Sequence, residues 1–313
     1  MDSLSLDAQV MKLSTRIWLT TFFAFGTIMW YETINGGSWQ VSMLVAVLMT
    51  LLALNEVFGN ARPWLVGLFA AGAFLSRYDL LLTWPFYFLL VVYRRPTVRW
   101  TSALPICYGF ALAAIIYIAF NEARWGTLTD QGLWRYDPAN GNLPLTTPPT
   151  LFAWRYFPGN FFTLFYMAPR LDATFPYIHP LPGGQSILTT SPAFLLALRA
   201  KFWRKKDVIC DQCSPVFRRG VRGRMRGVLA QLPRASGDVI AVAAMAILSA
   251  LPVLLYVGNG MTQFGTRHFV EVFPFLTVLM AMGGELDQMG KVLIVTSVAL
   301  IALGILSIRW YGL

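Results

Sequence analysis

The sequence predicts an all-α fold, a polytopic transmembrane helical bundle of about eight to nine spans that include short or broken ones and carry an ordered outer loop. Composition is the first observation: 56% of the 313 residues are hydrophobic and 13% are charged, against roughly 25% charged residues in soluble domains. Long apolar runs are the second, because about 20 apolar residues cross a bilayer as a helix. The third is the gathering of Lys and Arg on alternate connections, which is typical of inserted membrane proteins.

Each span is predicted from an apolar run. The runs are Ile17–Ile34, Val41–Phe58, Pro63–Tyr93, Thr101–Phe120, Ile187–Ala200, Val239–Val257, Phe269–Gly284 and Val292–Ile308. We expect Pro63–Tyr93 to form two short spans that meet near Arg77. Ile187–Ala200 and Phe269–Gly284 are short for a full crossing, so we expect tilted or broken helices there.

The orientation follows from the basic residues. With a cytoplasmic N-terminus, most of the 25 Lys and Arg residues fall on cytoplasmic connections, which satisfies the positive-inside rule. The same rule accounts for the net charge of +10, so we expect the lipid bilayer as a partner and no nucleic acid. Met1–Val10 is polar and acidic, unlike a cleavable signal peptide. The prediction is a multi-pass protein of a bacterial inner (plasma) membrane, with its protein partners left open.

The chain divides into three parts. Residues 1–198 hold transmembrane helices and an outer cap loop over 121–185, residues 199–236 form a basic cytoplasmic loop, and residues 237–313 hold the C-terminal transmembrane helices. Prolines in the cap loop exclude a long regular helix, and its many aromatic residues exclude a disordered linker. We therefore expect an ordered cap with one interfacial or re-entrant helix near Leu151–Met167.

No metal site is predicted. Cys210 and Cys213 have half the spacing of a zinc site, which needs about four ligands. No other Cys or His lies near them in the sequence, and the topology puts His179 and His268 on the opposite side of the membrane. No cofactor is predicted with certainty, and the sequence leaves a requirement for a divalent metal open.

Two charged residues stand inside the apolar run Pro63–Tyr93. A charged side chain deep in a bilayer costs several kcal/mol, and such residues usually face a cavity or a partner. Arg77 and Asp79, at i and i+2, would point to different sides of a continuous helix. We expect the helix to break here, where the chain surfaces or lines an aqueous cavity. A pair of Arg77 and Asp79 that only fixes a helical hairpin is the alternative.

Two further polar clusters lie at outer ends of spans. The segment NEARWGT begins where the span Thr101–Phe120 ends and places three side chains at the membrane surface: Asn121, Glu122 and Arg124. The segment QFGTRHFVEVFP leads into the span Phe269–Gly284. If it is helical, three residues at i, i+4 and i+8 share one face: Gln263, Arg267 and Glu271. A simple salt bridge between Arg267 and Glu271 is the alternative.

These clusters predict a site for an anion. A guanidinium binds phosphate through a planar, multidentate fork, and the phosphate of a lipid carrier lies at this depth. The residues predicted to hold the donor phosphate or line the cavity are Arg77, Tyr78, Asn121, Arg124, Gln263 and Arg267. A carboxylate can deprotonate an acceptor, and the candidates are Asp79, Glu122 and Glu271.

Three segments carry a resemblance to a known group of enzymes. They are GLFAAGAFLSRYDLLLTWPF, NEARWGT and QFGTRHFVEVFPFL, in this order and separated by spans. They resemble the later membrane segments of GT-C-type glycosyltransferases of the family 39-like group, relatives of protein O-mannosyltransferases and aminoarabinose transferases. The likeness runs from Phe22 to Leu279. It implies a polytopic enzyme that takes a sugar from a polyprenyl-phosphate donor, with Arg77, Arg124 and Arg267 near the donor phosphate.

The sequence departs from that group at the first outer loop. The group carries its catalytic acid in a long loop there, whereas Glu32–Gln40 is short and contains one carboxylate. The resemblance therefore implies the C-terminal portion of such a protein, without the acidic catalytic loop, and leaves open whether this chain transfers a sugar alone. The alternatives are a non-enzymatic transporter or flippase of an anionic lipid-linked glycan and a structural subunit of a membrane complex. The sugar and the acceptor are not predicted.

Overall fold

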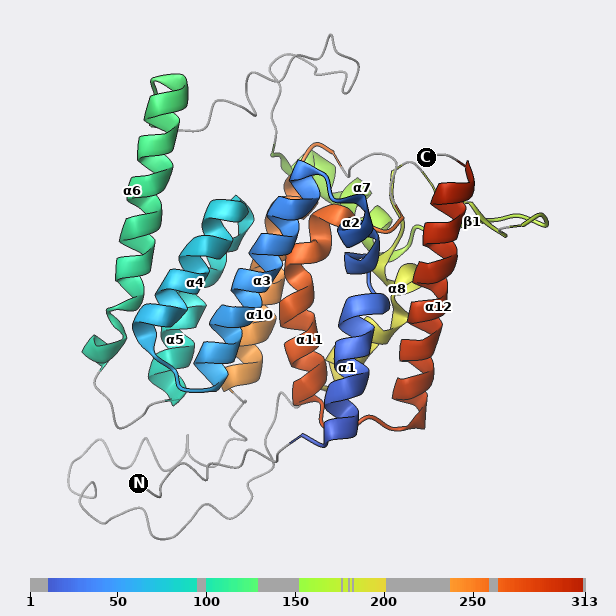
Figure 1. The fold of residues 1–313 in the computed structure, drawn as a ribbon, viewed down its shortest axis with the longest axis horizontal. Coiled ribbons are helices and arrows are strands. Elements are labelled where there is room, and N and C mark those ends of the chain that lie inside the picture. Colours follow the sequence, from blue (N-terminus) through green and yellow to red (C-terminus); the bar gives the residue numbers. More distant parts are fainter. Residues whose placement is uncertain are drawn as a thin grey trace.

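The structure is a computed structural model, and it describes residues 11–94, 100–128, 152–175, 177–179, 181, 183–200, 237–258 and 264–311. Its described part is a bundle of helices with one short antiparallel hairpin, β1 (Arg170–Leu171) and β2 (Ile178–His179) (Figure 1). The predicted all-α class is therefore confirmed. Gln263, the core of the predicted basic loop (201–236) and much of the predicted cap (129–151) lie outside the described residues.

The helices are α-helical with 3-10 segments between them. In chain order they are α1 (Leu13–Phe25), α2 (Met29–Asn35), α3 (Ser38–Phe58), α4 (Pro63–Ser76), η1 (Tyr78–Thr83), α5 (Trp84–Arg94), η2 (Trp100–Ala103), α6 (Ile106–Trp125), η4 (Trp154–Tyr156), α7 (Phe157–Phe165), α8 (Ile187–Thr190), η5 (Pro192–Arg199), α10 (Gly237–Leu255), η7 (Arg267–Val272), α11 (Phe273–Met282) and α12 (Gln288–Tyr311).

Four of these helices are long and apolar enough to cross a membrane. They are Ser38–Phe58, Thr101–Trp125, Gly237–Leu255 and Gln288–Trp310, and Pro63–Ser76 is a shorter apolar helix. This supports a multi-pass helical membrane protein. The other predicted spans are shorter or interrupted in the described residues: α1 has 13 residues, α5 has 11 and α11 has 10. The run Ile187–Ala200 is divided between α8 and η5. The described residues contain four helices long enough to cross a membrane, so the predicted count of eight to nine spans is not confirmed.

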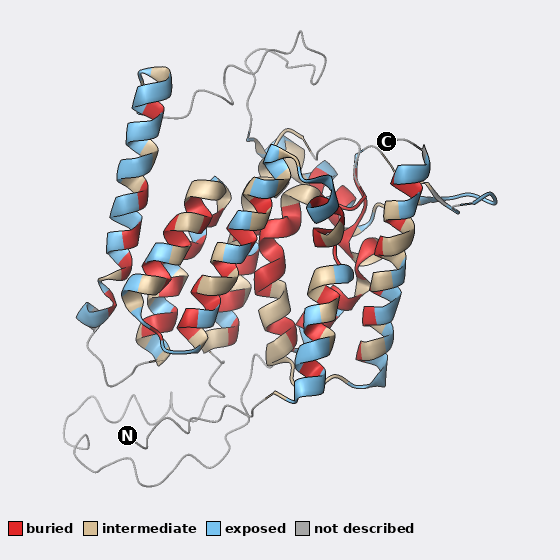
Figure 2. Ribbon diagram, viewed as in Figure 1, coloured by how far each residue is buried: buried red, intermediate tan, exposed pale blue. Residues whose placement is uncertain are grey.

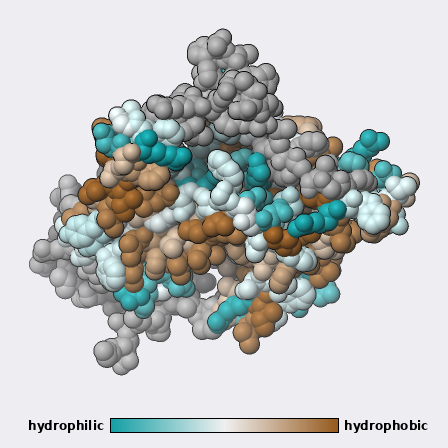
Figure 3. All heavy atoms as spheres, turned by 45° about the horizontal axis from the view of Figure 1, so that its top comes forward, coloured by the Kyte–Doolittle hydropathy of each residue, from teal (hydrophilic) through white to brown (hydrophobic). Residues whose placement is uncertain are grey.

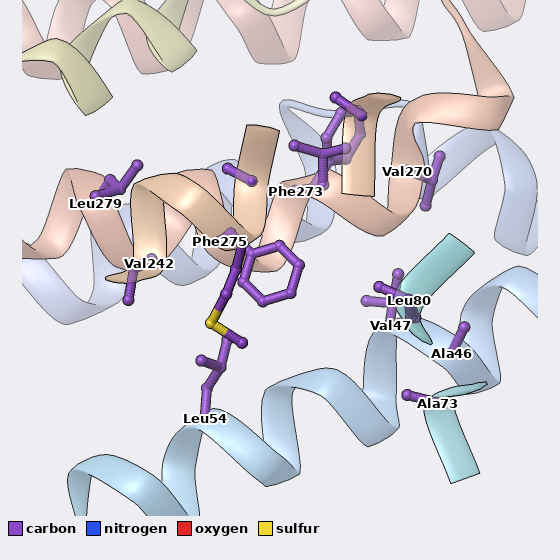
Figure 4. Close-up of a cluster of buried hydrophobic side chains, with 14 of the residues drawn as sticks. Ala46, Val47, Leu54, Ala73, Leu80, Val242, Val270, Phe273, Phe275 and Leu279 are labelled. Carbon is purple, nitrogen blue, oxygen red and sulfur yellow. The ribbon is translucent and has the colours of Figure 1, made fainter. Parts of the chain in front are cut away.

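The core lies where α3, α10 and α11 meet. Figure 2 shows buried residues concentrated along α10 and α11 and on the facing sides of α3 and α4. In Figure 4, Leu54 of α3 points toward Phe275 of α11, and Leu80 of η1 lies beside Val47 of α3. Burial of a large apolar side chain contributes roughly 1.5–3 kcal/mol to stability, relative to the same side chain exposed to water. This shared core fixes η1 and the start of α11 relative to α3.

Helix α6 is attached at the edge of the bundle. It packs on α4 through two glycines, and a Cβ added to Gly109 would overlap the carbonyl of Gly67. Small residues let membrane helices approach this closely. Much of the rest of α6 is apolar and exposed, as at Tyr108 and Ile115, which suits contact with lipid. Figure 1 shows its C-terminal end standing apart from α2.

The helix ends fall into two sets. The α1 end of the bundle carries the start of α1, the connection from α3 to α4, and the starts of α10 and α12; the α2 end carries α2, the end of α4 and the end of α10. At the α2 end several helices are broken. Helix α4 stops at Ser76, and Arg77 is extended, with φ −147° and ψ 115°. The predicted break at Arg77 is therefore confirmed.

Candidate ionic site at the α2 end

Breaks in three helical regions bring charged side chains together at the α2 end. Arg77 follows α4, Asp79 lies in η1, and Glu32 lies in α2. Arg267 and Glu271 lie in η7, immediately before α11. We call these five residues the ionic cluster. Arg77 is extended between α4 and η1, Asp79 and Glu271 lie in 3-10 segments, and Glu32 lies in the short helix α2 that follows the end of α1.

Arg77 lies between two carboxylates from different elements. Its Nε is 2.5 Å from Glu271 Oε1 and 3.8 Å from Asp79 Oδ1. The side chain of Glu271 is 0% exposed, that of Asp79 is 10% exposed and that of Arg77 is 17% exposed. A buried charge is tolerated only when it is paired, so this pairing explains how Arg77 is accommodated. An anionic ligand at Arg77 would compete with these two carboxylates.

Glu32 is the most isolated member of the ionic cluster. It is 0% exposed, and neither of its carboxylate oxygens has a hydrogen-bond partner among the described residues. It interacts electrostatically with Arg267 and with Glu271. Oε2 of Glu271 and Oδ2 of Asp79 also lack a described hydrogen-bond partner. Several buried acceptors therefore converge on this place.

The ionic cluster has more carboxylates than guanidiniums. Glu32, Asp79 and Glu271 face the positive charges of Arg77 and Arg267. Because buried acceptors that stay unpaired are costly, the arrangement favours a ligand that brings hydrogen-bond donors. Three or more His, Cys, Asp or Glu side chains arranged to hold a metal ion are not found in the described part of the chain.

Two ring-bearing residues border the ionic cluster. Tyr256 follows the end of α10, and its ring centroid is 6.0 Å from that of His268 in η7. Both residues interact electrostatically with Arg77. Figure 3, which turns the α2 end forward, shows hydrophilic atoms gathered near the middle of that face, between apolar atoms and the grey segments. This side of the molecule therefore carries hydrophilic groups at its surface.

A buried glutamine fixes the turn that precedes Arg267. The side-chain Oε1 of Gln185 accepts a hydrogen bond from the Gly265 backbone amide at 2.7 Å, and the backbone amide of Gln185 donates to the Gly265 carbonyl at 3.1 Å. The hydroxyl of Thr266 donates to the Gln185 carbonyl at 2.9 Å. Gly265 has φ +88°, a conformation that favours glycine. The turn therefore holds η7 in a defined position beside α2.

The cluster at the end of α6 lies apart from the ionic cluster. Arg124 is exposed, with its guanidinium carbon 4.6 Å from the centroid of the Trp125 ring, and Glu122 is exposed. Asn121 is buried and donates to the Tyr117 carbonyl at 2.9 Å. Tyr78 packs edge-on against Tyr117, with ring centroids 5.5 Å apart. These four predicted residues line the face between α4 and α6 or the surface of α6.

The segment that contains Arg267 and Glu271 differs from the prediction. It is a 3-10 helix, Arg267–Val272, rather than an α-helix, so the i, i+4 spacing of Arg267 and Glu271 does not put them on one face. Glu271 forms an ion pair with Arg77. This ion pair joins η7 to the break after α4.

Sequence reasoning missed Glu32 as a site residue. The sequence predicts Glu32 in a short outer loop, whereas it lies in a buried helical turn, α2. One signal could have found it, because Glu32 is a carboxylate inside the apolar run Ile17–Ile34. Tyr256 and His268 were missed because aromatic residues are common throughout this sequence.

Comparison of the chain with family models, with curated proteins and with solved structures gave no match in any of the three. The functional argument therefore depends on the geometry of the ionic cluster.

Proposed function

We propose that this chain binds a polyprenyl-phosphate-linked sugar at the α2 end and acts as a GT-C-like membrane glycosyltransferase. The observation that carries the proposal is the buried ionic cluster, in which both carboxylate oxygens of Glu32 and Oε2 of Glu271 lack a described hydrogen-bond partner beside two arginines. Intramembrane ionisable residues mark functional sites more often than not. A lipid-linked sugar suits this place because its tail remains in the bilayer while its polar head reaches the helix ends.

The arginines and the carboxylates of the ionic cluster bind different parts of the ligand. A guanidinium has five N–H donors in a fork that matches phosphate, so the contact of Arg77 through Nε does not exhaust its capacity. The carboxylates accept hydrogen bonds from sugar or acceptor hydroxyls. Arg267 and Arg77 are therefore assigned to the phosphate, and the carboxylates to hydroxyl groups.

Transfer needs one base and one leaving group. Glu32, Asp79 or Glu271 takes the proton from an acceptor hydroxyl, and the acceptor oxygen forms a bond to the anomeric carbon of the sugar. The bond between that carbon and the phosphate oxygen breaks, and the polyprenyl phosphate leaves with the electron pair. Glu32 is our first choice of base because both of its oxygens lack described hydrogen-bond partners.

The test measures binding to protein in lipid nanodiscs. The probes are undecaprenyl phosphate linked to mannose, glucose or arabinose. We expect Glu32→Gln and Arg267→Gln each to weaken binding about tenfold or more, which corresponds to about 1.4 kcal/mol. Arg309→Gln is the matched control, because Arg309 is exposed at the last turn of α12. Wild-type protein that binds none of the probes, or two site variants that bind like wild type, would overturn the proposal.

A transporter of lipid-linked glycans is the second candidate. Helix α4 is interrupted at Arg77 and the run into α11 begins with the 3-10 segment η7, and discontinuous helices at a binding site are typical of transporters. Proteoliposomes that carry a fluorescent lipid-linked sugar separate the two functions. Appearance of a glycosylated acceptor supports the enzyme, and movement of the lipid between leaflets without such a product supports the transporter.

A further inference from the structure

We propose that Phe152, Tyr256 and His268 form an aromatic row that contacts the sugar ring of the ligand at the rim of the ionic cluster. This inference rests on the proposed function and adds the surface that recognises the sugar rather than the phosphate. The row runs from the segment before α7, across the end of α10, to η7.

The three rings follow one another at contact distances. The ring centroids of Phe152 and Tyr256 are 5.4 Å apart with planes at 52°, and those of Tyr256 and His268 are 6.0 Å apart with planes at 57°. Phe152 is 51% exposed, and Tyr256 and His268 are half-buried. Tyr256 and His268 both interact with Arg77. The row therefore begins at the surface and ends at the charged groups.

The backbone around Tyr256 is held from several sides. Asn160 of α7 is buried and its Nδ2 lies 3.2, 3.0 and 2.7 Å from the carbonyl oxygens of Val253, Leu254 and Tyr256. The Ala153 amide donates to the Leu255 carbonyl at 2.9 Å. The last carbonyls of a helix have no partner within the helix, and these donors satisfy them. Tyr256 is thus fixed in place although its ring remains partly exposed.

An aromatic face suits a sugar ring and does not suit a phosphate. The face of an aromatic ring carries partial negative charge, so it attracts the C–H groups on one face of a sugar and repels an anion. The hydroxyl groups at the edge of the sugar can then reach the carboxylates of the ionic cluster. Ligand sites commonly combine an apolar wall with a few convergent polar groups in this way.

The experiment compares two probes on one variant. Tyr256→Ala should weaken binding of undecaprenyl-phosphate mannose, glucose or arabinose by about five- to tenfold, while binding of undecaprenyl phosphate without a sugar should change by less than about twofold. Tyr256→Phe keeps the ring and should bind the sugar-linked probes within about threefold of wild type. Tyr166→Ala is the matched control, because Tyr166 follows α7 and is exposed.

The outcomes distinguish a ring-binding role from a structural one. Equal weakening of both kinds of probe in Tyr256→Ala would show that the residue only supports the fold, and unchanged binding of the sugar-linked probes would show that no sugar lies against it. Either result overturns the inference while leaving the proposed function intact. Wild-type protein that binds neither kind of probe overturns the proposed function and this inference together.

Discussion

The two ends of the helix bundle carry ion pairs of different kinds. At the α1 end, Lys12 Nζ is 2.7 Å from Glu285 Oε2, and the two side chains are 68% and 61% exposed. At the α2 end, Arg77 meets Glu271, whose side chain is 0% exposed. The exposed pair lies in water and is screened by salt, whereas the buried pair has given up its hydration. The same chemical interaction therefore has different consequences at the two ends.

At the α1 end, exposed ion pairs link helices that are connected or adjacent there. Arg199 and Asp287 are 3.0 Å apart and link the end of η5 to the start of α12. A hydrogen bond from the Gly290 amide, together with Arg199, holds the pKa of Asp287 below its ordinary value. None of this requires the removal of charges from water. The ionic cluster at the α2 end does require it, and a function for those charges explains why they are kept there.

The pair of Glu56 and Arg62 at the α1 end departs most from this division. Glu56 is 6% exposed, and its carboxylate accepts hydrogen bonds from the backbone amide, Nε and Nη2 of Arg62, each at 2.9 Å. These contacts close the turn between α3 and α4, where Ala61 has φ 51°. A variant of Glu56 can therefore show why ion pairs at the two ends contribute differently to stability. The cause is either the burial of the carboxylate or the end of the molecule at which the pair lies.

Removal of Glu271 should have the largest effect. In Glu271→Ala, Arg77 keeps only the more distant Asp79, so we expect a loss of about 3–5 kcal/mol in the free energy of unfolding. The measurement is unfolding in mixed micelles by titration with a denaturing detergent. A loss below about 1 kcal/mol would mean that the pair behaves like an exposed one, and the comparison of the two ends would fail.

A double-mutant cycle attributes that loss to the pair. Replacement of both partners, Arg77→Met with Glu271→Leu, should recover much of the stability because no unpaired charge stays buried. The recovered protein should not bind the sugar-linked probes, since the site has lost its charges. Additive losses in the double variant would show that each residue acts through other contacts.

Glu56→Ala should have the second largest effect. It removes three hydrogen bonds from a buried carboxylate, so the loss should be smaller than for Glu271→Ala and clearly larger than for an exposed pair. Thermal unfolding in detergent checks the rank. If burial of the carboxylate decides the loss of stability, the loss in Glu56→Ala should rank directly after that in Glu271→Ala. A loss as small as that of Glu285→Ala would instead show that the end of the molecule, and not burial, decides how much an ion pair contributes to stability.

The sequence could predict where helices break or end better than which helices lie side by side. Hydropathy placed the break of the helix at Arg77 correctly, because charge within an apolar run is a local signal. It also placed Arg124 at a helix end, as the structure has it. It could not show that α6 lies at the edge of the bundle, since that depends on the contact of Gly109 with Gly67. Two arginines near helix ends in the sequence can therefore belong to different parts of the bundle.

The ionic cluster itself needed the tertiary structure. Glu32 and Glu271 are far apart in the sequence, and their electrostatic interaction depends on how α2 packs near η7. The i, i+4 rule assumed an α-helix at Arg267, and the chain forms a 3-10 helix there. Pattern rules describe regular helices, so they fail where a helix is interrupted, and the candidate site lies at such interruptions.

Asp238→Ala should have an intermediate effect. Asp238 is 16% exposed and lies 3.0 Å from Arg94, whose guanidinium also contacts the Phe58 carbonyl at 3.4 Å and the Phe58 ring at 4.9 Å. Because Arg94 keeps these contacts, we expect a loss of about 1 kcal/mol. Detergent-induced unfolding measures it, with Asp238→Asn as the control that keeps the size of the side chain. A loss equal to that of Glu271→Ala would contradict the order set by burial.

Glu285→Ala should have the smallest effect. Both partners of the pair with Lys12 are exposed, and such pairs contribute about 0.2–1 kcal/mol. The remaining contribution should disappear when the salt concentration is raised to about 1 M, where the screening length falls to about 3 Å. The loss in Glu271→Ala should persist under the same conditions because salt does not reach a buried pair. Unfolding of both variants at low and high salt tests this, and equal salt sensitivity would show that water and ions reach the ionic cluster as freely as they reach the α1 end.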